Sequence, residues 1–133
     1  MTIEGSDIHA ELLKHIGQQF GPYKGWDTVN SAMIRHWCEA MGDTNPLYLD
    51  EEFAASTPHG GLVAPPTMLQ AWNMTGYAGR SAPGSSTEDA FYVATLLDEF
   101  GYPGVVAVNC EQEYFKYIRE GDQIYHTAQV EAV

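Results

Sequence analysis

The chain has 133 residues, which is the usual size of one domain. Its composition, with 44% hydrophobic and only 18% charged residues, favours a folded core and excludes a disordered chain. The formal net charge of −12, with only 6 Lys and Arg residues, argues against nucleic acid as a partner, because phosphate binding needs clustered cations.

Three helices and an extended piece are predicted in the first part of the chain. Apolar residues at helical spacing indicate a helix from Asp7 to Phe20, followed by an extended piece from Tyr23 to Val29. A helix is predicted from Ser31 to Met41, because Asn30 is a suitable N-cap and Gly42 is a suitable residue after the last turn. The third helix is short and follows a loop.

That loop runs from Gly42 to Leu49, and Asp50 then caps the short helix from Glu51 to Ser56. A stiff Gly-Gly to Pro-Pro turn comes next, after which a helix is predicted from Pro66 to about Thr75. This helix is apolar on most sides and carries little charge, so we expect it to be buried.

The apolar side chains in and after the buried helix allow two interpretations. Met68, Trp72, Met74 and Tyr77 would suit a bulky apolar ligand, and they would suit an ordinary hydrophobic core equally well. The pattern alone leaves both open.

The second half of the chain changes from helical to alternating patterning. A polar loop from Ser81 to Thr87 precedes a helix from Glu88 to Phe100. Alternating residues then predict strands over Val105–Ile118 and Ile124–Val130, separated by a turn at Glu120–Asp122. The chain stops inside a strand pattern, so we expect one domain over residues 1–133 that is a fragment of a longer chain; an edge strand at a natural end is the alternative.

The N-terminus and the cysteines bear on where the protein works. No basic stretch followed by an apolar run stands at the N-terminus, and no segment approaches the roughly 20 apolar residues of a membrane span. We therefore expect a soluble, cytoplasmic protein with no membrane partner. Cys38 and Cys110 lie far apart without metal-ligand spacing, and both are predicted to be buried, reduced thiols.

The loop after the second helix carries a specific motif. It resembles the signature G-D-x-N-P-[IL]-H-x-D of the MaoC-like (R)-specific enoyl-CoA hydratases and dehydratases, which a short helix containing alanine follows. Within this family the chain is similar to the N-terminal domain of the larger subunit in heteromeric hydratases of sterol side-chain degradation. The matching residues are Gly42, Asp43, Asn45, Pro46, Leu47, Asp50 and Ala54.

The resemblance implies an α+β hot-dog fold, in which a curved antiparallel sheet wraps a central helix, here with its last strands missing. It also implies reversible addition of water to an enoyl thioester of coenzyme A. In the family, the aspartate and histidine of the signature hold and activate the water, because such a pair can accept and deliver protons near neutral pH. No metal and no separate cofactor are expected, since coenzyme A is part of the substrate.

Two departures from the family pattern affect this chemistry. Tyr48 stands at the position of the signature histidine, and a phenol with a pKa of about 10 is a poor base at pH 7. The family also uses a backbone amide at the start of the central helix to hold the thioester oxygen. If Pro65-Pro66 occupy that place, neither has an N–H, although Thr67 could still donate. Of the remaining histidines, His59 is the best substitute for the missing imidazole.

We therefore predict the non-catalytic, pocket-forming part of a heterotetrameric enoyl-CoA hydratase that acts on steroid side-chain thioesters. Asp43 and Tyr48 are degenerate catalytic positions, and the expected substrate-binding residues are Asn45, Thr67, Met68 and Trp72. The expected partners are a smaller hot-dog subunit with the Asp–His pair, the acyl-CoA substrate, and a downstream aldolase or thiolase-like enzyme.

Two alternatives remain open at this point. One is a self-sufficient homodimeric dehydratase that uses Asp43 with Tyr48 or His59. The other is a non-enzymatic scaffold that docks other acyl-CoA enzymes, which the unfinished sheet at Val133 would serve.

Overall fold

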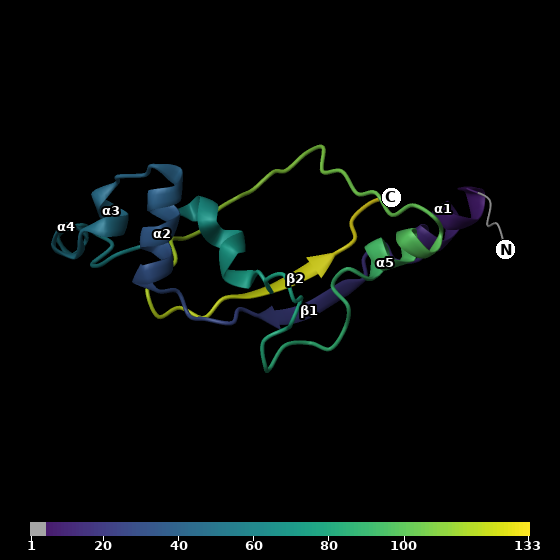
Figure 1. The fold of residues 1–133 in the computed structure, drawn as a ribbon, viewed down its shortest axis with the longest axis horizontal. Helices are drawn as coiled ribbons and strands as arrows, with labels where there is room; N and C mark the ends of the chain where they lie inside the picture. Colours follow the sequence, from purple (N-terminus) through teal and green to yellow (C-terminus); the bar gives the residue numbers. More distant parts are fainter. Residues whose placement is uncertain (1–4) are drawn as a thin grey trace. The chain divides into compact units, whose positions relative to one another are not determined.

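The computed structural model describes residues 5–133. These residues form two compact units (Figure 1). The second unit comprises Tyr23–Ser85 and Glu113–His126, and the first comprises the other described residues. The signature motif lies entirely in the second unit, which therefore holds the candidate site.

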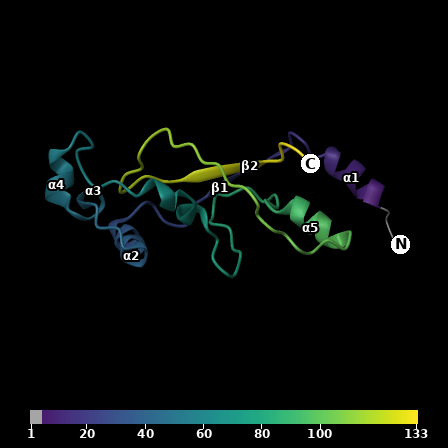
Figure 2. The ribbon, with the colours of Figure 1, turned by 90° about the horizontal axis from the view of Figure 1, so that it is seen from above.

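The first unit is built on two helices, α1 (Gly5–Leu13) and α5 (Tyr92–Glu99) (Figure 2). They meet through apolar side chains at helical spacing, which are withdrawn from water and contribute the main stabilisation of this unit. The buried members are Ile8, Leu12 and Leu96, and Val93, Leu97 and Phe100 pack against them.

Both helices are shorter than predicted. The helix expected to reach Phe20 ends at Leu13, and Gly17 then adopts a φ of 82° while its N–H donates to the carbonyl oxygen of Val130 at 2.7 Å. Phe20 lies in a strand instead, with its side chain buried. The apolar side chain of Phe20 continues the helical spacing. The hydrogen bond from Gly17 to Val130 nevertheless takes the backbone out of the helix before it reaches Phe20.

The helix expected from Glu88 begins only at Tyr92. The Asp89 carboxylate accepts the Phe91 N–H at 2.8 Å and the Thr95 hydroxyl at 3.1 Å, and this turn occupies the residues before the helix. An aspartate side chain that binds nearby backbone thus sets the start of α5.

The described residues form one antiparallel pair of strands, β1 (Gln19–Lys24) and β2 (Tyr125–Gln129), which lie side by side in Figure 1. The predicted strand at Ile124–Val130 is confirmed to within a residue at each end, whereas the first extended piece begins earlier than predicted. The predicted α+β class is confirmed. Among residues 5–133, no helix is long and apolar enough to cross a membrane.

The strands predicted over Val105–Ile118 do not form. The valines at the start of the stretch are open to solvent, with Val106 82% exposed and Val108 83% exposed. A strand needs a neighbouring strand to pair with its N–H and C=O groups, and the sheet of the described residues consists of β1 and β2 alone. Cys110 lies in the same stretch and is exposed, so the prediction that it is buried is wrong.

The two free thiols should therefore react very differently. Cys38 is buried, and that burial, with the nearby Asp43 carboxylate adding to it, raises the pKa of its thiol. We expect a disulfide reagent such as DTNB to modify one thiol per native chain within minutes and the second only after unfolding. A Cys110→Ser variant should lose the fast reaction, and two equally fast thiols in the native protein would contradict this assignment.

The second unit begins with the helix whose bounds the sequence predicts. α2 runs over Ser31–Met41, the Asn30 side chain accepts the Met33 N–H at 2.9 Å, and Gly42 closes the helix with a φ of 67°. The buried face of α2 consists of Ile34 and Cys38. Local capping chemistry accounts for both ends of this element.

The predicted central helix is present as η1 (Pro66–Asn73), a 3₁₀ helix that ends two residues early. Met68 and Trp72 on η1 are 1% and 3% exposed, so the interpretation of these two as core residues is confirmed, whereas Met74 and Tyr77 are exposed. The backbone also packs tightly here, because a Cβ at Gly25 would overlap the carbonyl oxygen of Trp72. The full core cluster is Val29, Ile34, Cys38, Ala64, Met68 and Trp72.

Candidate functional site

The signature loop is more structured than predicted. Its last residues form a short helix, α3 (Pro46–Leu49), which Asn45 caps by accepting the Leu47 N–H at 3.0 Å. Proline at the first helical position suits this start, because its fixed φ is helical and its missing N–H would have no partner there. The prediction of a loop over Gly42–Leu49 is thus correct only as far as Asn45.

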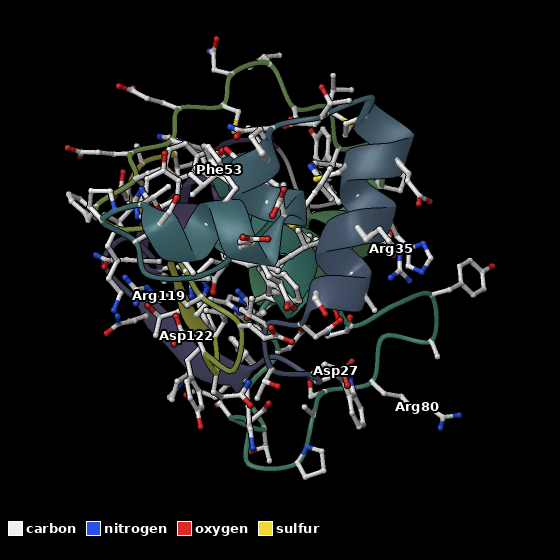
Figure 3. The ribbon with its side chains drawn as sticks, turned by 90° about the vertical axis from the view of Figure 1, so that its left-hand side faces the viewer. Asp27, Arg35, Phe53, Arg80, Arg119 and Asp122 are labelled. Atoms are coloured by element: carbon white, nitrogen blue, oxygen red, sulfur yellow. The ribbon has the colours of Figure 1, made fainter. Side chains whose placement is uncertain are left out.

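The aspartates of the signature also hold backbone. One oxygen of the Asp43 carboxylate accepts the Asn45 N–H at 3.0 Å. The Asp50 carboxylate accepts the Phe53 N–H at 2.9 Å and so caps α4 (Glu51–Ser56). Figure 3 labels Phe53 on this helix. The prediction for Asp50 and the helix after it is confirmed. The motif's polar residues therefore have structural roles.

Tyr48 lies at the junction of the signature and the core. Its side chain is half-buried and packs against the core cluster. Burial raises the pKa of the Tyr48 phenol, and the neighbouring Tyr117, Asp43 and Cys38 raise it further, while a hydrogen bond with Asn45 opposes them. The phenol therefore stays protonated at neutral pH and can donate a hydrogen bond, but it cannot accept a proton from water.

His59, the expected substitute for an imidazole, contacts another aromatic ring. Its ring centroid lies 4.8 Å from that of Tyr117, with the ring planes at 68°, which is an edge-to-face contact. Its backbone N–H donates to the Thr57 hydroxyl at 3.3 Å. His36 is exposed on α2, with its Nδ1 atom 3.9 Å from a Glu39 carboxylate oxygen, so it contributes nothing to this cluster.

A cavity of about 190 Å³ opens beside the start of η1. One wall comes from the turn and the first residues of η1, and the other from an extended segment that carries several aromatic rings. The lining residues are Ala64, Pro66, Leu69 and Glu113–Ile118. Tyr117 belongs to this lining and also contacts His59, so it connects the cavity with the signature region.

None of the four residues predicted to bind substrate belongs to the lining of this cavity. Met68 and Trp72 face the core, Asn45 caps α3, and Thr67 is exposed. Thr67 carries the first N–H of η1, because Pro66 has none, and the Met68 N–H donates to the Pro65 carbonyl oxygen at 3.1 Å. Among residues 5–133, no three metal-ligating side chains gather closely enough to hold an ion.

Tyr117 is the member of the site that sequence reasoning missed. It lies in an alternating stretch that indicates only a strand, and no motif marks it. Its proximity to His59 depends on the Ala64 N–H donating to the Ile118 carbonyl oxygen at 2.9 Å, a pairing between residues far apart in sequence. The aromatic cluster of the stretch was the only signal that could have drawn attention to it.

Residues 14–133 match the family described as FAS1-like, dehydratase domain region. A probable enoyl-CoA hydratase alpha subunit of Thermomonospora curvata is 44% identical over 98% of this chain. The 3-oxo-4,17-pregnadiene-20-carboxyl-CoA hydratase alpha subunit of Mycobacterium tuberculosis is 42% identical over 78% of it. This chain spans only 41% and 32% of the lengths of these two relatives. A UPF0336 protein of Streptomyces griseus, 31% identical over 89% of this chain, is matched over 70% of its own length.

One solved structure is similar across nearly the whole chain. It is a chain of the ChsH1-ChsH2 complex from Mycobacterium tuberculosis, with a TM-score of 0.80 and 39% identity. The match covers 93% of this chain and 72% of that one. The neighbour has a hot-dog fold, so the predicted hot-dog fold is confirmed.

Proposed function

The chain belongs to the FAS1-like dehydratase domain region family, and on this basis we propose that it is the non-catalytic, pocket-forming part of a heteromeric enoyl-CoA hydratase. A smaller hot-dog subunit supplies the acid–base pair, and the substrate is a steroid thioester of coenzyme A. The complex works in the cytoplasm. The name of the Thermomonospora curvata relative supports an enoyl-CoA substrate, and the name of the Mycobacterium tuberculosis relative supports a steroid thioester.

The observation that carries the proposal is that a partly buried tyrosine, Tyr48, stands at the position of the signature histidine. Hydration needs a group that takes a proton from water as it attacks Cβ, and burial moves the pKa of Tyr48 away from neutral pH. The other candidate base, His59, stacks edge-on against Tyr117. The water must then be activated by residues from another polypeptide.

The size of the cavity supports a shared site. Its volume of about 190 Å³ lies below the roughly 300–1,000 Å³ of pockets that enclose drug-sized ligands. A steroid nucleus therefore needs a further wall, which the smaller subunit would provide.

The charge distribution fits an anionic thioester bound at the second unit. Five of the six Lys and Arg residues belong to this unit, and one of them lines the cavity. The Lys116 ammonium would attract a phosphate of coenzyme A, and it shares the cavity lining with the Glu113 carboxylate. The five are Lys24, Arg35, Arg80, Lys116 and Arg119.

The proposal is tested by assaying hydration of a steroid enoyl-CoA with this chain alone, with the smaller subunit alone and with both. We expect turnover at an enzymatic rate only when both are present. Full activity of this chain by itself, abolished by Asp43→Asn, would instead establish the self-sufficient dehydratase. Stable binding of the smaller subunit without hydratase activity under any condition would indicate a scaffold.

A further inference from the structure

Tyr117 occupies a position that no other described residue shares. It belongs to the lining of the cavity beside η1, and its ring contacts His59 in an edge-to-face arrangement with the ring centroids 4.8 Å apart. It also lies close enough to the Tyr48 phenol to affect its ionisation. Tyr117 is therefore a residue of the cavity lining that also contacts His59.

We propose that Tyr117 determines which acyl groups the cavity admits, and that His59 is a positioning residue that holds the Tyr117 ring in the wall. This inference rests on the proposed function, because it specifies the substrate selectivity of the same site. It assigns His59 a role in shaping the pocket rather than in proton transfer.

The backbone that carries Tyr117 is fixed immediately after it. The Ala64 N–H donates to the Ile118 carbonyl oxygen at 2.9 Å, and Val63 and Arg119 form an antiparallel bridge. The following turn is closed by the Asp122 carboxylate, which accepts the Arg119 N–H at 2.9 Å, and Figure 3 shows these two residues close together. The position of the Tyr117 Cα is thereby tied to the turn before η1.

The side chain of Tyr117 is fixed from the other direction. His59 follows α4, where the Thr57 hydroxyl donates to the Ala54 carbonyl oxygen at 2.6 Å and accepts the His59 N–H at 3.3 Å. The imidazole then makes an edge-to-face contact with the ring of a tyrosine that is still 42% exposed. Because solvent covers much of this ring, the histidine contact is what restrains its rotation toward or away from the cavity.

Removing the ring should open the cavity toward the signature region. Tyr117→Ala deletes part of a wall that limits the size of the acyl group, and a single methylene in an apolar pocket changes selectivity by about 10–200-fold. We expect the ratio of kcat/KM for a steroid enoyl-CoA to kcat/KM for crotonyl-CoA to rise about tenfold, mainly through KM. Tyr117→Phe keeps the ring and should change the ratio less than twofold, whereas His59→Ala should raise it about threefold.

The measurement uses the complete complex with the smaller subunit, and thermal unfolding checks that each variant is folded. Tyr77→Ala is the matched control, because Tyr77 is a fully exposed tyrosine outside the cavity lining. His59→Phe should restore the edge contact and return the ratio to within twofold of the wild type. An imidazole needed for proton transfer would not be replaced by phenylalanine, so a large fall of kcat in His59→Phe would overturn the positioning role.

Binding of saturated acyl-CoA analogues, measured by calorimetry, separates this inference from the proposed function. If the wild-type complex binds them and Tyr117→Ala changes neither the ratio of kcat/KM values nor the ratio of analogue affinities, the inference is wrong and the proposed function stands. If the wild-type complex binds no acyl-CoA at all, both are wrong. A shift of affinity toward the bulkier analogue in Tyr117→Ala supports the inference even without turnover.

Discussion

Replacing Met68 by alanine is expected to lower the free energy of unfolding of the chain by about 2–5 kcal/mol. Met68 is 1% exposed and lies in the core cluster of the second unit, between α2 and η1 side chains. The substitution removes buried methylene and sulfur contacts and leaves a cavity. The prolines at the start of η1 restrict the backbone movement that would fill it. Urea unfolding followed by tryptophan fluorescence measures the change.

The neighbouring residue provides the matched control. Leu69 follows Met68 on η1 but is 37% exposed, so Leu69→Ala deletes fewer buried contacts and should cost less than about 1 kcal/mol. Equal losses in the two variants would show that η1 does not present one buried face. A loss confined to Met68→Ala would show that the core of this unit depends on the 3₁₀ helix.

Elements that local chemistry determines could be predicted from the sequence. The ends of α2 follow from the Asn30 cap and from Gly42 in a left-handed conformation, and the start of α4 follows from Asp50. Each of these interactions joins residues within four positions of one another, so the printed order of residues already contains both partners.

Elements that need a distant partner could not be predicted correctly. Val106 and Val108 alternate as a strand would, yet strand formation depends on a neighbouring strand that the described residues do not supply. The early end of α1 likewise depends on a bond from Gly17 to Val130, more than a hundred residues away. A periodic pattern shows what a segment could pair with, and tertiary contacts decide whether it does.

The candidate site divides in the same way. Asp43 and Tyr48 are recognisable because the motif places them in fixed order. The structure adds that the Asp43 carboxylate accepts the Asn45 N–H and that burial raises the pKa of the Tyr48 phenol. Tyr117 and its contact with His59 arise from pairing between the turn before η1 and the residues before β2. Only a fold brings those segments together.

Tyr48→Phe in this chain is expected to change the hydration rate of the complex by less than about threefold. A group that supplies general acid–base catalysis contributes about 10²–10⁴-fold, so replacing the histidine of the Asp–His pair that we propose for the smaller subunit should lower the rate by that much. The two substitutions therefore differ by at least about thirtyfold if Tyr48 takes no proton. Steady-state rates on a steroid enoyl-CoA, with both variants assembled into the complex, give the comparison.

The pH dependence provides an independent check on Tyr48. Because its pKa is raised above the usual value of about 10, fewer than roughly one phenol in a thousand is ionised at pH 7. A catalytic phenolate would make the rate climb about tenfold per pH unit from pH 7 to 9, since its ionised fraction rises with pH over that range. We expect no such climb, and superimposable pH profiles for the wild type and Tyr48→Phe. A climb that disappears in Tyr48→Phe would mean that this chain activates the water itself.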